Sequence, residues 1–418
     1  MKVKKINNKI FNYIVSLFIF QIIAIQVFDL FGISGFAAIP YYRLSNIIFT
    51  FFYFLTEILL KKLTLKNTSV MFIEDIIVSL WFGFTCIELL YGILLANPLV
   101  YLIADFVYIA FGILIYIIIS NMLKFKKKLD FDTINWYATV IIILSYLVIL
   151  FDLTVPSILF IVLISLSYFY LIEKKYLKSI IALIPFFLEV SNSNRALLLV
   201  FMAMLLLYFI YRLSIYFKKL DRIIIITLIL ILILTTYQEI ITLSLNFFSE
   251  NSEIYFRLSQ MLDIINEGID YSSPYHISVS QRLIEAQIVI SLWTENIFSF
   301  IFGSGLGGVI DGKYFIDNAV ISSALLGEKS IHNIHLLPFA FIHKYGFLGL
   351  IIMILLIVDF FNSIKKSIRY GSSTIHNFWN ILFVLIFIYS IPAASFLWTS
   401  ALFWVTMAMK RNQNVLYE

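Results

Sequence analysis

Two histidines, His332 and His335, stand three residues apart where an apolar segment resumes after a long polar stretch. Imidazole exchanges a proton near neutral pH, so two such side chains on one helix face could form an acid/base pair. Arg282 and Glu285 lie within the polar stretch, and Arg195 opens another apolar segment. Guanidinium groups bind anions through paired N–H donors. These residue types predict a site that transfers protons and binds an anionic group.

Each candidate also has a simpler explanation. Arg195 could be an interfacial anchor whose long stem lies along the apolar surface. Arg282 could form a surface ion pair with Glu285, three residues on at helical spacing. The histidine spacing also suits a metal, but no cysteine or His-Glu-x-x-His pattern lies nearby, and Cys86 is the single cysteine. A metal site is therefore the weaker interpretation.

The segment after the histidines contains further ionisable groups. His343 and Lys344 would lie deeper in a continuous helix, where such groups usually line an internal cavity. Pro338 permits instead a broken or partly interfacial helix before Gly346, and the sequence leaves both geometries open. The glycine-rich run 303–308 lacks the strand-turn-helix context of a nucleotide-binding motif, so we interpret it as a tight turn whose amides could face an anion.

The chain that must position these residues is strongly apolar. Hydrophobic residues make up 61% of its 418 residues, charged residues only 13%, and the mean hydropathy is +0.97. These values exclude an ordinary soluble globular protein. The apolar runs approach the roughly 20 residues that a helix needs to cross a bilayer, about twice the length of a barrel strand. We therefore expect an all-α polytopic membrane protein.

Hydropathy predicts about twelve transmembrane helices. They lie near 10–32, 43–60, 70–95, 100–123, 135–151, 155–173, 177–190, 194–213, 222–242, 334–361, 376–392 and 394–409. Lysines and arginines gather after every even-numbered span, and such residues favour the cytoplasmic side. Both termini are therefore predicted to be cytoplasmic and the polar stretch to lie outside. The last two spans are short and could form a re-entrant pair.

The same pattern divides the chain into three regions. Residues 1–242 are predicted to form an N-terminal transmembrane bundle, 243–333 one large extracytoplasmic loop, and 334–418 the C-terminal transmembrane helices. Acidic residues outnumber basic ones in the loop. Apolar residues recur at three- and four-residue spacing in 254–265 and 282–293, which predicts amphipathic helices on the outer membrane surface.

Three short motifs follow one another on the predicted outer side. They are Arg195-x3-Leu199, Arg282 ahead of the Gly-x-Gly-x-Gly run 303–307, and His332-Asn333 ahead of Gly346-x-x-Gly349. In this order they resemble the bacterial O-antigen polymerase and O-antigen ligase superfamily of integral membrane glycosyltransferases. The resemblance covers about residues 190–350, and the rest of the chain is similar only in topology.

The histidine motif can be aligned in two ways. The family places nine residues between its histidine-amide pair and the first glycine, whereas twelve separate Asn333 from Gly346. Counting from His335 restores nine, but Leu336 then replaces the amide. Both His332 and His335 therefore remain candidates for the functional histidine.

The resemblance implies that a glycan is transferred from an undecaprenyl diphosphate donor to a hydroxyl of a second lipid-linked acceptor. The implied diphosphate- and substrate-binding residues are Arg195, Arg282, Asn194 and Asn333, and the implied proton acceptors are His335, His332 and, as a lesser candidate, Glu285. Guanidinium groups would stabilise the charge on the departing diphosphate, and a histidine would take the hydroxyl proton. This chemistry needs neither metal nor another cofactor.

The expected location is the bacterial inner membrane, with the reaction at its periplasmic face. Membrane lipids and a chain-length regulator are expected partners, and nucleic acid is not. We favour a polymerase of O-antigen or capsular repeat units over a ligase that moves finished glycan to a lipid or protein, although both would use the same groups. A flippase of lipid-linked oligosaccharide is the alternative from another class, but transporters usually carry internal repeats and polar groups at mid-membrane.

Overall fold

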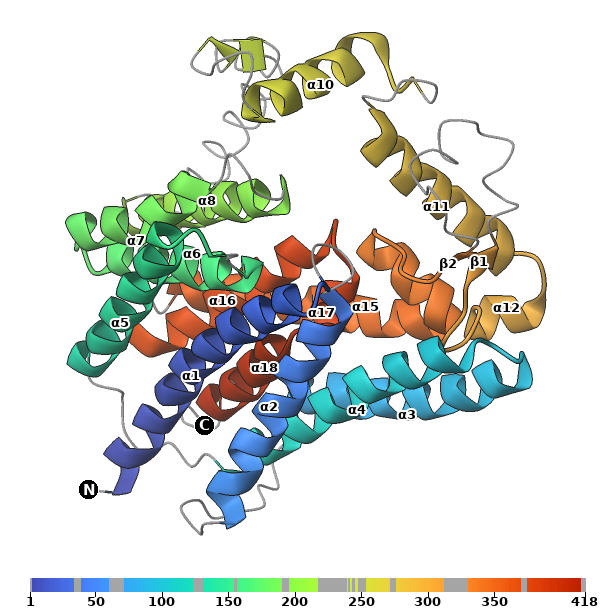
Figure 1. Cartoon of the computed structure of the whole chain (residues 1–418), viewed down its shortest axis with the longest axis horizontal. Helices are drawn as coiled ribbons and strands as arrows, with labels where there is room; N and C mark the ends of the chain where they lie inside the picture. Colours follow the sequence, from blue (N-terminus) through green and yellow to red (C-terminus); the bar gives the residue numbers. More distant parts are fainter. Residues whose placement is uncertain are drawn as a thin grey trace.

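The computed structural model describes residues 2–33, 39–59, 71–122, 131–153, 156–189, 195–216, 239, 241–242, 245–246, 253–270, 276–311, 330–369 and 374–414. Within these residues the regular secondary structure is helical except for one two-residue β-ladder. Most helices pack side by side in a bundle, while two helices of the polar stretch arch away from one end of it (Figure 1). The chain is an all-α protein, as expected.

The elements follow the hydropathy pattern closely. Before the polar stretch lie α1 (Lys2–Leu30), α2 (Ile39–Leu59), α3 (Ile73–Leu94), α4 (Leu99–Met122), α5 (Phe131–Leu150), α6 (Ser157–Ile172), α7 (Tyr176–Glu189) and α8 (Arg195–Tyr216). The polar stretch contains α10 (Glu253–Glu267), α11 (Ile277–Trp293), α12 (Ile297–Phe302), β1 (Ile310–Asp311) and β2 (Ser330–Ile331). The C-terminal region contains α15 (Leu337–Arg369), α16 (Thr374–Ser390), α17 (Ser395–Thr399) and α18 (Ala401–Asn414).

Several of these helices are of the membrane-spanning kind. Five are long and apolar enough to cross a bilayer, at Ile10–Leu30, Ile73–Leu94, Leu99–Asn121, Ala196–Tyr216 and Leu337–Ile368. Four shorter apolar helices are Asn135–Leu150, Ser157–Ile172, Tyr176–Leu188 and Phe378–Ser390. A helix satisfies its backbone N–H and C=O groups internally, which the bilayer interior requires. The composition and the helices together indicate a membrane-embedded protein.

The observed helices differ from the predicted spans toward the C-terminus. Helices cover the first eight predicted spans, and the ninth, 222–242, lies mostly outside the described residues. The last predicted span, 394–409, is two helices, because Ser400 adopts an extended conformation between α17 and α18. The two expected amphipathic segments lie within α10 and α11.

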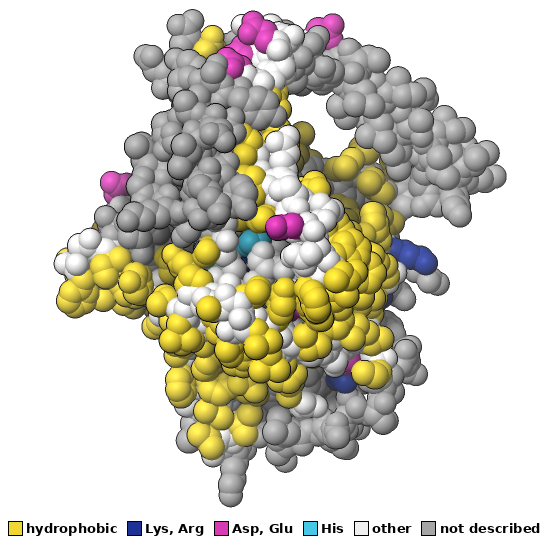
Figure 2. All heavy atoms as spheres, turned by 90° about the vertical axis from the view of Figure 1, so that its right-hand side faces the viewer, with side chains coloured by type: hydrophobic (Ala, Val, Ile, Leu, Met, Phe, Trp, Pro, Cys, Tyr) yellow, Lys and Arg dark blue, Asp and Glu magenta, His cyan; other side chains and the backbone are white. Residues whose placement is uncertain are grey.

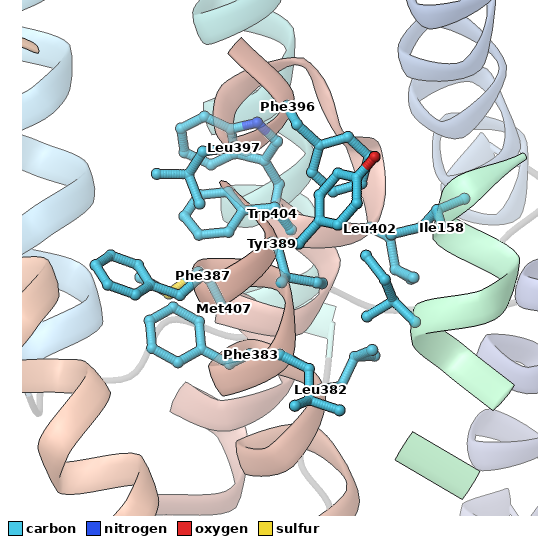
Figure 3. Packing of buried hydrophobic residues seen from close by; sticks show 14 of the residues in the cluster. Ile158, Leu382, Phe383, Phe387, Tyr389, Phe396, Leu397, Leu402, Trp404 and Met407 are labelled. Carbon is cyan, nitrogen blue, oxygen red and sulfur yellow. The ribbon is translucent and has the colours of Figure 1, made fainter. Parts of the chain in front are cut away.

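The centre of the bundle is built from α16 and α18. Every residue of α18 from 401 to 412 is buried, so this helix is enclosed by protein on all sides. Figure 3 shows Leu382, Phe383, Phe387 and Tyr389 of α16 packed with Phe396 and Leu397 of α17, Leu402, Trp404 and Met407 of α18, and Ile158 of α6. Because lipid tails are as apolar as these side chains, such packing stabilises a membrane bundle through van der Waals contacts between the helices. Gly112 of α4 leaves the space that the Trp404 indole occupies.

Helix α15 is broken, which settles the geometry that the sequence left open. The break occurs at Gly346, whose φ of 53° and ψ of −134° interrupt the helix eight residues after Pro338. Pro338 lies in the first turn, where a missing N–H is tolerated. A Cβ on Gly346 would lie 2.5 Å from the backbone nitrogen of Gly303. Residues 303–308, which we call the glycine turn, therefore pack against α15 at this kink. Gly303, Gly305 and Gly307 in this turn have positive φ angles.

Charged residues of α18 form ion pairs with the start of α3 and with the C-terminal half of α15. Lys410 Nζ lies 2.6 Å from Asp359 Oδ2 and 3.8 Å from Glu74 Oε1, and Arg411 Nε lies 3.1 Å from Asp75. We call these five side chains the C-terminal charge cluster. Each charge in this cluster is stabilised by an opposite charge, because a buried charge of either sign without a partner would be unfavourable.

Candidate active site

Glu285 and His335 form a hydrogen-bonded pair between α11 and the segment that enters α15. The His335 Nδ1 atom lies 2.9 Å from Glu285 Oε1 and 3.0 Å from Oε2, and the His335 backbone N–H donates to Oε2 at 3.1 Å. Because a carboxylate only accepts, Nδ1 carries the hydrogen and Nε2 is left with its lone pair. Gln281 Nε2 donates to Glu285 Oε1 at 3.0 Å. The carboxylate is thus held by three donors.

The two partners differ in their access to solvent. The Glu285 side chain is completely buried, whereas 41% of the His335 side chain is exposed. Figure 2 shows a histidine side chain at the surface of one face of the molecule, above a broad field of hydrophobic side chains. A buried carboxylate that orients an accessible imidazole is the arrangement expected of a general base and its orienting group.

The main chain around His335 is fixed from a second direction. Ala394 N–H donates to the His335 carbonyl at 2.9 Å, and Leu337 N–H donates to the Ile391 carbonyl at 2.9 Å. The turn between α16 and α17 therefore holds the segment just before α15. The imidazole is positioned by Glu285 on one side and by this turn on the other.

Arg282 lies one helical turn before Glu285 on α11, so both side chains emerge on the same side of the helix. Burial lowers the pKa of the Arg282 guanidinium from its ordinary value, while the negative charge of Glu285 raises it. A guanidinium remains protonated in proteins even so. Arg282 therefore places a partly buried positive charge beside the Glu285–His335 pair.

His332 belongs to a different, buried cluster. Its Nδ1 lies 3.0 Å from the Gly308 carbonyl, and its Nε2 lies 3.3 Å from Asp105 Oδ1 and 3.5 Å from Lys344 Nζ. Its ring stacks on Tyr101 with centroids 4.4 Å apart, and only 8% of the side chain is exposed. Both ring nitrogens of His332 are thus in contact with protein groups.

Asp105 of α4 is the negative centre of this buried cluster. It forms an ion pair with Lys344 of α15, and its Oδ2 accepts from the Gly307 N–H at 3.0 Å. One amide of the glycine turn, that of Gly307, therefore faces an anion, which is a carboxylate of the protein itself. We call Asp105, His332, His343 and Lys344 the buried ion network.

His343 completes the buried ion network and holds the same turn. Its Nε2 lies 3.3 Å from the Gly308 carbonyl, and its Nδ1 lies 3.3 Å from Ser304 Oγ. Because a carbonyl accepts, both His343 Nε2 and His332 Nδ1 donate to Gly308. The Ser304 N–H also donates to the His343 carbonyl at 2.7 Å. Two imidazoles therefore fasten the glycine turn to the start of α15.

The structure brings together only part of the predicted site. His332 and His335 do not share a helix face, because residues 332–336 precede the first turn of α15 and are not helical. Asn333 is exposed next to them. Arg195 is the first residue of α8, but its side chain lies outside the described residues, as does all of Asn194.

Sequence reasoning missed Asp105 and the pairing of His335 with Glu285. Asp105 was counted as part of an apolar span, yet it is the one charged residue between Leu99 and Asn121. A lone carboxylate within such a helix is itself a signal, since it is costly there unless it is paired. The Glu285–His335 pair joins residues 50 positions apart, and no local spacing encodes it.

The described residues contain no group of three or more histidine, cysteine, aspartate or glutamate side chains arranged to hold a metal ion. The candidate site brings together the imidazole of His335, the carboxylate of Glu285 and the guanidinium of Arg282. No protein-family model, curated protein or solved structure matches this chain.

Proposed function

We propose that this protein is an integral membrane glycosyltransferase that joins polyprenyl-diphosphate-linked oligosaccharide units into a longer polysaccharide, in the manner of O-antigen polymerases. One observation carries the proposal, namely the buried Glu285 carboxylate that orients the partly exposed imidazole of His335. A helical membrane protein with an oriented base beside a guanidinium suits transfer chemistry on a lipid-linked anion.

In the proposed reaction His335 is the general base. The acceptor hydroxyl oxygen attacks the anomeric carbon of the donor, and its proton passes to His335 Nε2. The bond between the anomeric carbon and the diphosphate oxygen breaks, and that oxygen keeps the electron pair. Glu285, bonded to Nδ1, stabilises the imidazolium that forms, and the exposed ring can then release its proton to water.

The arginines are proposed to stabilise the leaving group. The diphosphate gains negative charge as the glycosidic bond breaks, so cations already in place stabilise the transition state more than the ground state. Arg282, one turn from Glu285, is proposed for this role. Arg195, with Asn194 and Asn333, is proposed to contact the same substrate.

The proposed setting is the bacterial inner membrane, with about twelve spans, cytoplasmic termini and the site on the periplasmic side. Cysteine labelling of a Cys86→Ser protein tests this topology. Glu267→Cys on α10 should react with an impermeant maleimide in spheroplasts, whereas Lys174→Cys, in the turn between α6 and α7, should react only after lysis; both positions are exposed. The opposite pattern would place the site on the wrong side for a polyprenyl-linked donor.

Purified protein and lipid-linked repeat units test the activity. The wild type should convert single units into ladders, and His335→Gln should lose about 100- to 10000-fold in kcat because an amide cannot accept the proton. The glutamine can still donate to Glu285, so folding should be preserved. Full activity of His335→Gln, with ladders still formed, would contradict its role as the base.

Deleting the gene in its host distinguishes a polymerase from a ligase. Loss of a polymerase leaves surface glycan with single repeat units, whereas loss of a ligase leaves long polymer on the lipid carrier. Normal surface chains in the deletion strain would contradict both functions.

A further inference from the structure

Arg43 on α2 is a cation that the described residues bind only in part. Its Nη1 donates to Ser395 Oγ at 3.0 Å. Its Nε is buried, and among the described residues no acceptor reaches it. No carboxylate in the described part of the chain forms an ion pair with Arg43, although the side chain is half-buried. Its charge is therefore not compensated by the described protein.

Other buried cations of the bundle are treated differently. Lys344 pairs with Asp105, Lys410 with Asp359, and Arg411 with Asp75. Leaving one partly buried charge without its opposite is costly, and leaving a buried N–H donor without an acceptor adds to that cost. An anion would stabilise Arg43, and the described part of the chain supplies none.

The position of Arg43 connects it to the candidate active site. Its partner Ser395 directly follows Ala394, whose N–H donates to the His335 carbonyl at 2.9 Å. The start of α2 is held against α4 by Tyr108, whose hydroxyl donates to the Pro40 carbonyl at 2.8 Å. Arg43 thus lies at the same end of the bundle as His335, separated from it by one turn of backbone.

The arrangement of the remaining Arg43 donors indicates which kind of anion they would bind. Ser395 occupies Nη1, so the Nε and Nη2 donors remain as a parallel pair along one side of the planar guanidinium. Such a pair matches two oxygens of a phosphate or diphosphate better than a single carbonyl. Arg43 lies near the start of α2, and the phosphates found at the ends of helices in a membrane protein belong to lipids.

We propose that Arg43 binds the phosphoanion of a membrane lipid through its Nε–Nη2 edge. This deepens the proposed function, because the diphosphate of the lipid-linked donor is one source of that anion and a phospholipid headgroup is the other. The anion-binding role itself requires no glycosyl transfer, so the two can fail separately.

Native mass spectrometry of the purified full chain tests the proposal with geranylgeranyl diphosphate and, separately, phosphatidylglycerol as probes. Arg43→Gln should weaken binding of at least one probe by about ten- to hundredfold, the scale of a charge-assisted hydrogen-bonded contact. The matched control is Arg212→Gln on α8, since Arg212 is also partly accessible but donates to Tyr216 within its own helix. The control should bind both probes as the wild type does.

Each outcome decides between the sources or against the proposal. An effect on geranylgeranyl diphosphate alone identifies the donor diphosphate, and an effect on phosphatidylglycerol alone identifies a headgroup site. Unchanged affinity for both probes in Arg43→Gln overturns the proposal. If that variant is not recovered folded, Arg43→Lys decides: its charge remains but the planar fork is lost, so weaker binding is expected and wild-type binding overturns it.

The same experiment separates this inference from the proposed function. His335→Gln should bind geranylgeranyl diphosphate normally, because its imidazole is assigned to the acceptor proton. Arg43-dependent binding in a protein that never extends glycan would contradict the polymerase while supporting the phosphoanion site.

Discussion

His335 and His332 differ in what surrounds the second ring nitrogen. Glu285 hydrogen-bonds one nitrogen of His335, whose side chain is 41% exposed, whereas both nitrogens of His332 contact protein groups. A base needs an open lone pair within reach of the substrate. At the residue scale, this distinction assigns proton transfer to His335 and a structural role to His332.

Replacing His332 with alanine should therefore lower stability more than chemistry. The change removes a donor to Gly308 and the ring that stacks on Tyr101, and we expect a loss of about 1–3 kcal/mol. Thermal unfolding in detergent measures this, and kcat per folded molecule should stay within about tenfold of wild type. A kcat as low as that of His335→Gln, with unchanged melting temperature, would reverse the two assignments.

Neutralising the buried carboxylate of Asp105 should lower the stability of the protein, whereas neutralising that of Glu88 should not. Asp105→Asn leaves Lys344 without its counter-charge, which typically costs about 3–5 kcal/mol. Both side-chain oxygens of Glu88 on α3 lack hydrogen-bond partners among the described residues, so Glu88→Gln should leave stability unchanged or raise it. Melting temperatures of the pair check this, and equal losses would mean that Glu88 has a partner of similar importance.

The residue types of the site were predictable, but their pairings were not. Arg282, Glu285 and His335 stood out because charged and imidazole groups are rare in this chain. Their assembly depends on α11 lying against α15, and that contact joins residues far apart in sequence. The prediction that His332 and His335 share a helix face is wrong for a local reason. Pro338 belongs to the first turn of α15, and both histidines precede that turn.

At the scale of elements, close helix contacts depend on residues without side chains. Gly112 of α4 lies directly under the Trp404 indole of α18, and Gly346 receives the glycine turn in the kink of α15. A hydropathy profile marks both glycines as part of an apolar run. It located the helices because apolar length determines a span, but it could not show where α15 bends, because the bend depends on the turn packed against it.

Gly112→Ala and Gly83→Ala form a matched pair of helix substitutions. A Cβ at Gly112 would overlap the Trp404 indole, so we expect destabilisation of about 1–3 kcal/mol from overpacking. A Cβ at Gly83 of α3 meets nothing within 4 Å, and alanine there should gain up to about 1 kcal/mol in helix propensity. Melting curves of both variants test this. Equal stability would argue against the close approach of α4 and α18.

At the scale of the whole molecule, two polar assemblies connect α15 to its neighbours at two different levels. The buried ion network fastens α4 and α15 at the level of the site, and the C-terminal charge cluster fastens α3, α15 and α18 at the other level. The sequence did not predict that α18 is central. Neighbouring helices and lipid tails are equally apolar, so hydropathy cannot distinguish an interior helix from one that faces lipid.

Removing Lys410 should destabilise the whole bundle. Lys410→Met leaves Asp359 buried without its partner, and we expect a loss of about 3–5 kcal/mol. The double variant Lys410→Met/Asp359→Leu should recover part of that loss. Lys174→Met, at an exposed position, should change stability by less than about 0.5 kcal/mol. A double variant less stable than Lys410→Met would show that the pair does not act as a unit.

The enclosed position of α18 has a consequence for biosynthesis. Ribosomes add about 5–20 residues per second, so roughly 20–80 s separate the synthesis of α1 from that of α18. During that interval the earlier helices are in the membrane while the place that α18 fills has no protein in it. Until α18 is made, the carboxylates of α3 and α15 lack the ion pairs that Lys410 and Arg411 form with them. The bundle can therefore close around α18 only after the helices that surround it have been made.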